Sequence, residues 1–117
     1  MTYRDRGKEG EERALEFLKA QGYRIVARNY RWPGGEIDII ARDGDSLAFI
    51  EVKVRADELF APAEEALTPW KRERLIRTAQ HYITRYCPKV PLRFDVVMIV
   101  GEEVRLYKDA FRPEPEG

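Results

Sequence analysis

The first segment of the chain with a regular apolar pattern is typical of a helix. Its apolar residues recur three and four positions apart, and they are Ala14, Leu15 and Leu18. We expect this helix over about Gly7–Gln21, because Gly22 favours the left-handed backbone that ends a helix. Glu11 precedes the apolar residues by three, four and seven positions, so it is predicted to lie within the apolar face rather than on the solvated one.

Three stretches rich in alternating or continuous apolar residues follow, and each is predicted to be a strand. They cover about Tyr23–Arg31, Glu36–Asp43 and Ser46–Arg55. A turn at Trp32–Gly35 separates the first two strands. Between the second and the third, Asp43-Gly44-Asp45 is a strong signal for a hairpin.

The second half of the chain repeats the helical and the extended patterns. Thr68 as N-cap and Pro69 at the first helical position predict a second helix that runs to about Tyr86. Leu92–Val100 is almost continuously apolar, which is typical of an interior strand, and Val104–Tyr107 is predicted to be a short final strand. The order of helix, three strands, helix and two strands predicts an α/β fold with a mixed central sheet flanked by helices.

Length and charge limit the classes of protein to consider. The 117 residues suffice for one domain with a buried core, so we expect a single domain over residues 1–117, frayed at about 1–6 and 112–117. Lys plus Arg and Asp plus Glu each number 21, so net charge alone indicates neither a nucleic-acid nor a membrane partner. Because the chain has no run of 18 apolar residues and begins with a polar segment, we expect a cytoplasmic protein without a membrane partner.

The inventory of reactive side chains narrows the possible chemistry. Cys87 is the only cysteine, His81 the only histidine and Ser46 the only serine. These counts leave no basis for an internal disulfide, a Cys-rich zinc site or a Ser-His-Asp triad. Cys87 is interpreted as a small, at least half-buried side chain, and His81 and Asp95 as structural. Carboxylate and cationic side chains therefore remain as the candidates for a catalytic or binding site.

Charged residues are predicted to gather on one face of the central strand pair. Side chains alternate along a strand, so Asp38 shares a face with Glu36, while Glu51 shares one with Lys53 and Arg55. A two-residue loop keeps both sets on the same side of the sheet. A Gly44-Asp45 loop puts Asp38 directly opposite Glu51, and an Asp43-Gly44 loop offsets them by one pair. A three-residue loop would put them on opposite faces.

Two adjacent, mostly covered carboxylates repel each other and lose hydration, and a proton or a cation relieves both costs. Lys53 supplies one positive charge, and Mg²⁺ or Mn²⁺ would supply more, because carboxylate and carbonyl oxygens are hard ligands. Glu11 offers a further carboxylate from the first helix. The simplest explanation is a metal site that acts on phosphate, where a metal ion neutralises charge and activates water.

Ordinary structural roles are the alternatives for the same residues. Glu51 and Lys53 could form a cross-strand charge patch on the surface. Glu11 could serve the dipole of its helix, and Glu36 could satisfy the amides of the preceding turn.

Gly35-Glu36-Ile37-Asp38 followed by Glu51-Val52-Lys53 resembles the PD-(D/E)xK nuclease signature, with Glu51 thirteen positions after Asp38. The upstream Gly10-Glu11 is similar to the extra glutamate helix of archaeal Holliday-junction resolvases. Nearly the whole chain resembles the bacterial YraN-like family, in Gly10-Glu11, Ala14, Phe17-Leu18, Gly22-Tyr23, Asn29, Gly35-Glu36-Ile37-Asp38, Phe49-Ile50-Glu51-Val52-Lys53-Val54-Arg55, Thr68-Pro69, Lys71 and Phe94-Asp95. Ile37 stands where the name of the superfamily has proline.

This resemblance implies a restriction-endonuclease-like core and a metal-dependent endonuclease that hydrolyses DNA, with branched or flapped DNA of repair and recombination as candidate substrates. Asp38, Glu51 and the Val52 carbonyl would hold Mg²⁺ or Mn²⁺, Glu11 would help to bind or position the metal, and Lys53 would act on the attacking water. A homodimer is an open expectation, because junction-cutting relatives act as pairs. The alternatives are a non-catalytic nucleic-acid-binding module on a nuclease fold and a scaffold that binds a structural ion.

Positive charge is concentrated around the second predicted helix. Between Leu67 and Arg93 seven cations stand against one acid, Glu73. Such a bias in a neutral protein fits contact with a phosphate backbone. The candidate nucleic-acid contacts are Arg28, Arg31, Trp32, Arg55, Lys71, Arg72, Arg74 and Arg77. For Trp32 and the neighbouring Tyr30, packing at the edge of the sheet is an equally good interpretation.

Overall fold

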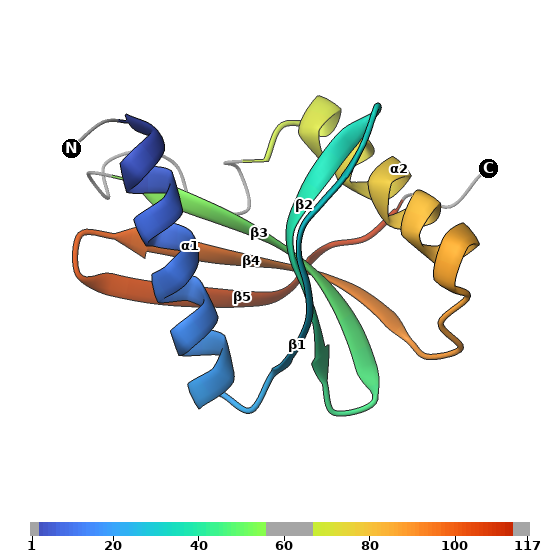
Figure 1. The fold of residues 1–117 in the computed structure, drawn as a ribbon, viewed down its shortest axis with the longest axis horizontal. Helices are drawn as coiled ribbons and strands as arrows, with labels where there is room; N and C mark the ends of the chain where they lie inside the picture. The colour runs from blue at the N-terminus through green and yellow to red at the C-terminus, as the bar shows by residue number, and fades with distance from the viewer. Residues whose placement is uncertain (1–2, 56–66, 114–117) are drawn as a thin grey trace.

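The computed structural model describes residues 3–55 and 67–113 of the chain. Within these ranges the helices and strands follow one another in the predicted order (Figure 1). Their bounds are α1 (Tyr3–Ala20), β1 (Arg24–Trp32), β2 (Gly35–Asp43), β3 (Ser46–Arg55), α2 (Pro69–Tyr86), β4 (Leu92–Val100) and β5 (Glu103–Phe111). Of the predicted frayed ends, residues 1–2 and 114–117 lie outside the described residues.

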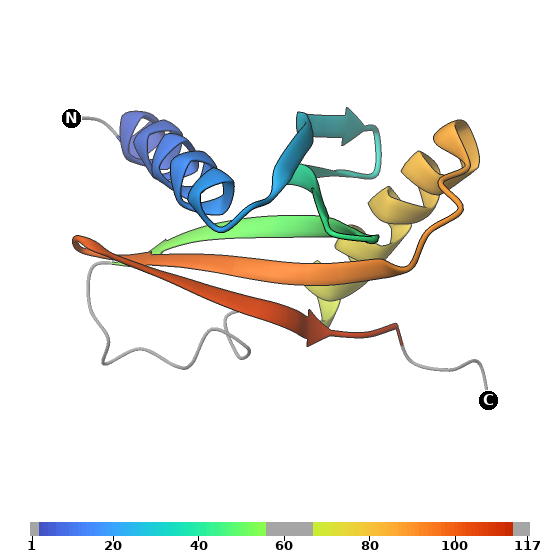
Figure 2. The same cartoon turned by 90° about the horizontal axis from the view of Figure 1, so that it is seen from below.

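The five strands form one mixed sheet in the order β1-β2-β3-β4-β5. β3 and β4 run parallel, whereas the other neighbouring strands are antiparallel. α2 lies in the connection between β3 and β4, as a parallel pair requires a crossover. Figure 1 shows α1 and α2 on opposite sides of the strands, and Figure 2 shows the β1–β2 hairpin raised above β4 and β5. The predicted α/β class with a mixed sheet flanked by helices is confirmed.

Alternate residues of β3 enter two separate apolar clusters. Leu47 and Phe49 join the cluster under α2, whereas Ala48 and Ile50 join the cluster under α1. The helices therefore cover opposite faces of the sheet, and this part of β3 is buried on both. Removing these side chains from water is the main source of stability for such a fold.

The second helix has its predicted bounds, but the first begins earlier than expected. The Thr68 hydroxyl accepts a hydrogen bond from the Lys71 N–H at 3.2 Å, which confirms the predicted N-cap. α1 begins at Tyr3 instead of Gly7, because the polar residues before Gly7 carry no apolar period that a sequence pattern could detect. Neither of the two described helices is long and apolar enough to cross a membrane.

Several strand bounds differ from the prediction. β1 covers Arg24–Trp32 instead of Tyr23–Arg31, and β2 begins at Gly35 instead of Glu36, so two residues expected in the turn belong to strands. β5 covers Glu103–Phe111 instead of Val104–Tyr107, since the β4–β5 register shifts between Phe94 and Val96, and a left-handed backbone at Asp109 of β5 allows pairing to resume between Phe94 and Phe111. Such a bulge leaves no trace in the alternation of apolar residues.

The lone cysteine lies at the C-terminal end of α2, and the lone histidine lies within α2 against β1. Cys87 is exposed, so the prediction of a half-buried side chain is wrong; it is the left-handed C-cap of α2, a position that projects away from the core. His81 Nδ1 lies 2.6 Å from the Tyr30 hydroxyl, and the Trp32 ring stacks on the imidazole with centroids 5.0 Å apart. His81 therefore joins β1 to α2, in agreement with its structural interpretation.

Asp95 is a buried structural carboxylate near the β2–β3 hairpin. It accepts hydrogen bonds from the Tyr23 hydroxyl at 2.9 Å, Arg93 Nε at 2.8 Å and the Asp109 N–H at 3.0 Å. Arg93 also pairs with Asp43 at 2.8 Å. Because every partner is supplied from within the fold, this network fastens β4 to β5 and to the connection between α1 and β1, and the predicted structural role is confirmed.

Candidate active site

The register of the β2–β3 hairpin decides where the carboxylates point. Asp43 pairs with Ser46, so the loop is Gly44-Asp45, one of the two alternatives that keep both carboxylates on the same side. Pairing continues from there to Ile39 and Ile50, with Gly44 in the left-handed conformation. Asp38 and Glu51 are the next residues along this ladder.

At Asp38 the second strand leaves the third. The β2–β3 pairing ends at Ile39, and on the other side Asn29 of β1, opposite Asp38, has a left-handed φ of 49°. Asp38 Oδ2 accepts a hydrogen bond from the Val52 N–H at 2.8 Å. The Asp38 side chain thus accepts the hydrogen bond that a neighbouring strand would otherwise accept from Val52. In a strand the N–H and C=O of one residue face the same side, so the Val52 carbonyl faces this opening as well.

Two hollows meet at this opening. The larger, of about 600 Å³, is lined from both faces of the sheet by Gly7, Glu11, Arg13, Asp38, Glu51, Val52, Lys53, Val54, Arg55, Lys71, Ile99 and Gly101. The smaller, of about 310 Å³, lies against the start of α2 and is lined by Glu36, Asp38, Glu51, Trp70, Lys71, Arg74 and Leu75. Asp38, Glu51 and Lys71 line both. The expected juxtaposition of the two carboxylates is therefore present.

Asp38 lies in surroundings that strongly disfavour its charge. Its exposed fraction is 9 %. Burial raises its pKa to about 8, and the negative charges of Glu51, Glu11 and Glu36 add to this effect, while the hydrogen bond from Val52 opposes it. A carboxylate whose ionised form would be stabilised so strongly by a nearby cation is a candidate functional residue.

Glu51 shares this environment but has lysines beside it. Lys53 Nζ lies 3.3 Å from Glu51 Oε1, and the two side chains are only 12 % and 18 % exposed. Burial raises the pKa of Glu51, and the charges of Lys53 and Lys71 oppose that rise. The neighbouring Lys53 in turn lowers the pKa of Lys71. Two ammonium groups and two carboxylates thus gather at one opening.

Glu11 reaches the larger hollow because α1 packs closely on β3. Gly10 is buried, and a Cβ at this position would lie 2.5 Å from Cγ2 of Val54. Only glycine allows this approach, which brings the next residue, Glu11, to the cavity wall. Glu36 lines the smaller hollow, where it pairs with Arg31 at 2.6 Å.

Comparison with known proteins matches residues 10–99 to the model of the Uncharacterised protein family UPF0102. A UPF0102 protein of Nitrosococcus oceani is 44 % identical over 119 aligned positions, which cover 97 % of this chain and 96 % of that protein. UPF0102 proteins of Dechloromonas aromatica and Lachnoclostridium phytofermentans are 45 % and 47 % identical and cover 91 % and 86 % of this chain. The chain belongs to the UPF0102 family. The resemblance to the YraN-like family is thereby confirmed, and because these names state no activity, function must be inferred from the site.

The oxygen donors of the UPF0102 site are few but suitable for a hard cation. Within residues 3–55 and 67–113, no three His, Cys, Asp or Glu side chains are grouped to hold a metal. Asp38, Glu51 and the Val52 carbonyl remain as donors. Mg²⁺ keeps several waters and is commonly bound by one or two carboxylates together with substrate phosphate. The donor set therefore fits Mg²⁺ or Mn²⁺, with Glu11 close enough for its charge to act on Asp38.

The structure brings some of the candidate nucleic-acid contacts to the site and places the others elsewhere. Arg55, Lys71 and Arg74 line the two hollows. The remaining arginines are engaged in other contacts, as Arg28 pairs with Glu12, Arg31 with Glu36 and Arg77 with Glu73, while the Arg72 guanidinium lies over the Phe111 ring. The Trp32 indole donates to the Thr78 hydroxyl at 2.7 Å, so Trp32 matches the alternative of edge packing.

One aromatic and one charged side chain of the hollows were not anticipated from the sequence. Trp70 lines the smaller one and is 64 % exposed, with the Arg74 guanidinium 4.8 Å from its ring centroid. A tryptophan off the apolar face of a helix is a signal that could have been noticed. Arg13 lines the larger hollow and donates to the Gly101 carbonyl at 2.7 Å, for which the sequence offers no signal.

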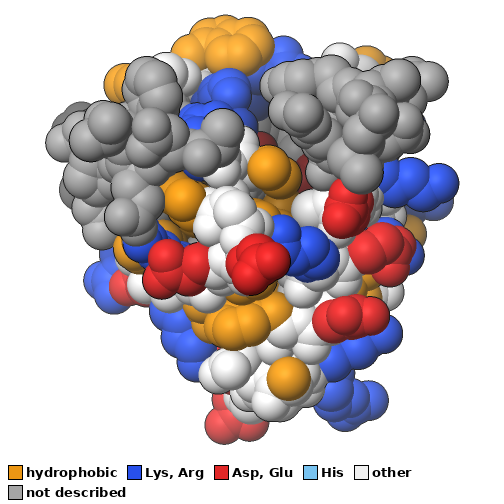
Figure 3. Space-filling model, turned by 90° about the vertical axis from the view of Figure 1, so that its left-hand side faces the viewer, with side chains coloured by type: hydrophobic (Ala, Val, Ile, Leu, Met, Phe, Trp, Pro, Cys, Tyr) orange, Lys and Arg blue, Asp and Glu red, His pale blue; other side chains and the backbone are white. Residues whose placement is uncertain are grey.

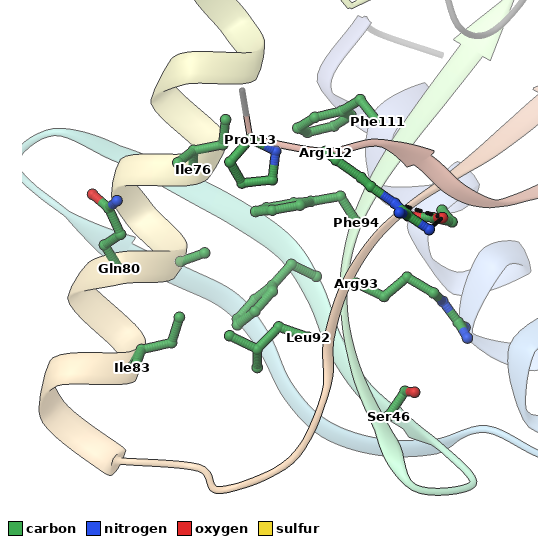
Figure 4. A pocket seen from close by; sticks show the side chains of 13 residues that line it. Ser46, Ile76, Gln80, Ile83, Leu92, Arg93, Phe94, Phe111, Arg112 and Pro113 are labelled. Carbon is green, nitrogen blue, oxygen red and sulfur yellow. Dashed lines mark hydrogen bonds and ion pairs between the residues drawn. The ribbon is translucent and has the colours of Figure 1, made fainter. Parts of the chain in front are cut away.

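A further cavity, of about 630 Å³, lies between α2 and the start of β4 and end of β5. Figure 4 shows Ile76 and Ile83 of α2 facing Leu92 and Phe94 across it. It is mainly apolar, and its carboxylate Asp109 already pairs with Arg112 at 2.6 Å. Among the described residues its lining contains one carboxylate rather than a pair, so the candidate chemistry is assigned to Asp38 and Glu51 instead.

Proposed function

We propose that this UPF0102 protein is a Mg²⁺- or Mn²⁺-dependent endonuclease that hydrolyses phosphodiester bonds in DNA. The single observation that carries the proposal is the meeting of Asp38 and Glu51 in one hollow with Lys53 3.3 Å from Glu51. Buried carboxylates that raise each other's cost of ionisation are stabilised by a divalent cation. The resemblance to PD-(D/E)xK nucleases assigns the same residues to metal binding and water activation.

Each residue has a chemical task in this proposal. Asp38, Glu51 and the Val52 carbonyl would hold the ion, which when bound neutralises phosphate charge and lowers the pKa of water. The Lys53 ammonium orients the attacking water and stabilises the charge that develops on phosphorus. Lys71, at the junction of both hollows, binds a phosphate oxygen. One water is consumed, and a phosphate monoester and a sugar hydroxyl are released.

The substrate must reach a site in a protein of mixed surface charge. The face seen from the left of Figure 1 carries acidic and basic side chains in close mixture (Figure 3). We therefore attribute phosphate recognition to the cations of the hollows, Arg55, Lys71 and Arg74, rather than to a broad basic surface. Since one described chain offers one such opening, cutting two strands together would require a second copy.

Cleavage assays with matched variants test this function. Purified protein is incubated with supercoiled, single-stranded, flapped and four-way DNA, and with the corresponding single-stranded RNA, in Mg²⁺, Mn²⁺ or EDTA. We expect metal-dependent cleavage that is lost in Asp38→Asn and Glu51→Gln and kept in Asp43→Asn, a change of the same type in the same hairpin but outside the hollows. Cleavage that persists in both site variants would refute the proposal.

A non-catalytic nucleic-acid-binding module is the second candidate. It is favoured by the finding that no three-ligand group occurs among the described residues and that Lys53 already neutralises part of the Glu51 charge. Binding of DNA without cleavage under every metal condition would select this alternative. Binding of the same strength in Mg²⁺ and EDTA would strengthen it.

A further inference from the structure

The exposed aromatic ring beside the carboxylates has no role in the fold or in the chemistry described above. Trp70 is 64 % exposed in the first turn of α2, where the helical periodicity places it on the side away from the buried Leu75 and Ala79. It shares the smaller hollow with Asp38 and Glu51. A large ring left in water at a site of this kind is a candidate contact for a ligand.

The charges around this ring fit a nucleotide. The Arg74 guanidinium lies 4.8 Å from the ring centroid, and Lys71 lines the same hollow. A flat aromatic surface beside two cations matches a base joined to a phosphodiester backbone. The second tryptophan is unsuitable, because the Trp32 ring is stacked on His81 and its indole N–H is bonded to Thr78.

Only an unpaired base can use such a surface. In a duplex each base is already stacked between its neighbours, whereas a base in a single strand, flap or gap can be splayed onto an aromatic side chain. A phosphodiester at Asp38 and Glu51 would have its adjoining base within the hollow that Trp70 lines.

We propose that Trp70, together with Arg74, forms a stacking platform for an unpaired nucleobase next to the phosphodiester at Asp38 and Glu51, so that the protein selects strands with unpaired nucleotides at the site. This inference rests on the proposed function and specifies its substrate class. Trp70 is a specificity-determining residue in this proposal and takes no part in bond cleavage.

Binding measured in EDTA tests the platform without requiring cleavage. Labelled oligothymidine and a duplex of the same length are titrated with wild type, Trp70→Ala and Trp70→Phe, and fluorescence anisotropy gives each Kd. We expect Trp70→Ala to weaken binding of the single strand roughly fivefold or more, because stacking of one base on an aromatic ring typically contributes at least this factor. Trp70→Phe should bind the single strand with a Kd between those of wild type and Trp70→Ala. The Kd of the duplex should change little in either variant.

Tyr86→Ala is the matched control. Tyr86 is also an exposed aromatic residue of α2, at 53 %, with the Arg85 guanidinium 5.3 Å from its ring centroid, and it lines neither hollow. Its substitution should leave the Kd of the single strand unchanged. In Trp32→Phe the emission comes from Trp70 alone, and oligothymidine should quench it, which provides a readout independent of any loss of affinity.

The outcomes separate this inference from the proposed function. If metal-dependent cleavage occurs but Trp70→Ala binds single strands as tightly as wild type, the platform is wrong and the nuclease assignment stands. If wild type binds duplex and single strand equally, the selection for unpaired nucleotides is wrong. If sedimentation shows a dimer that Trp70→Ala dissociates, with strand binding unaffected, the ring serves a second copy of the chain and the proposal is overturned.

Discussion

Replacing Asp38 by asparagine should make the protein more stable at neutral and alkaline pH. The folded state raises the pKa of Asp38 to about 8 from its ordinary value of 3.8, so it holds a proton that the unfolded chain has lost. Stability from this group is therefore greatest in acid and falls as the pH rises from about 4 to about 8. Asparagine keeps an oxygen that can accept the hydrogen bond from Val52 and removes the charge.

The size of this effect follows from the shift. Each pH unit between the two pKa values costs about 1.4 kcal/mol, so the upper bound at pH 7 is about 4 kcal/mol. Glu51 can bind the proton in place of Asp38, so the cost of ionisation is divided between the two carboxylates. We therefore expect the free energy of unfolding of Asp38→Asn to exceed that of wild type by at least about 1.4 kcal/mol at pH 8. For a domain of this size that corresponds to a rise in Tm of roughly 4 °C or more.

Thermal unfolding at pH 4.5 and pH 8, each with and without Mn²⁺, measures this difference. Without metal the variant should melt higher than wild type at pH 8, and the two should converge in acid. Mn²⁺ should raise the Tm of wild type, because a ligand that binds only the folded state stabilises it, and should have little effect on the variant. Identical pH dependence of the two proteins would refute the assignment of Asp38 to a desolvated, negatively charged site.

Asp43→Asn is a control of opposite sign. Hydrogen bonds from Arg93 and Lys108 lower the pKa of Asp43 below its ordinary value. Its contribution to stability is therefore present above about pH 4 and is lost as the pH falls through the lowered pKa. Asp43→Asn should reduce stability at pH 8 and have less effect in acid.

Three further predictions concern other parts of the fold. Gly10→Ala should lower the free energy of unfolding by about 1 kcal/mol in urea titrations, since its Cβ would meet Val54 at 2.5 Å. Gly7→Ala in the same helix has open space around its Cβ and should be neutral or stabilising. Equal effects of the two substitutions would contradict the close packing of α1 on β3. Lys71→Ala should weaken DNA binding at all sequences and reduce the slope of log K against log salt by about 1 in anisotropy titrations, and an unchanged slope would show that this lysine contacts no phosphate. Arg93→Ala should cost roughly 3 kcal/mol in unfolding experiments because it leaves a buried carboxylate without its cation, while cleavage per folded molecule should stay unchanged.

Local patterns account for most of the secondary structure and for the pairing of the carboxylates. The Thr68-Pro69 start of α2 and the bounds of β3 and β4 follow from short stretches of residues. The hairpin signal at Asp43–Asp45 and the two-residue period of the strands predicted that Asp38 and Glu51 share a side of the sheet if the loop has two residues, and the structure has that loop at Gly44-Asp45. These features depend on neighbours along the chain or across one hairpin, and such neighbours are visible in sequence.

The contacts of individual charged side chains could not be predicted in this way. Arg28, Arg31 and Arg77 carry the same charge as Lys71 and Arg74, yet they pair with surface carboxylates away from the shared opening or at its margin. Which carboxylate each arginine pairs with depends on how the helices and strands are arranged in space. A count of cations between Leu67 and Arg93 therefore identified a basic region without identifying which members face the site.

From the sequence, residue alternation and the hairpin signal leave two arrangements: Asp38, Glu51 and Lys53 lie on one side of the sheet with a two-residue loop, and the carboxylates lie on opposite sides with a three-residue loop. The folded structure adds that the loop is Gly44-Asp45, that β2 departs from β3 at Asp38, that Gly10 brings Glu11 to the same hollow, and that Trp70 lies beside it. These outcomes depend on the twist of the sheet and on the close approach of helices to it. Both are properties of packing between segments far apart in the chain, which no local pattern contains.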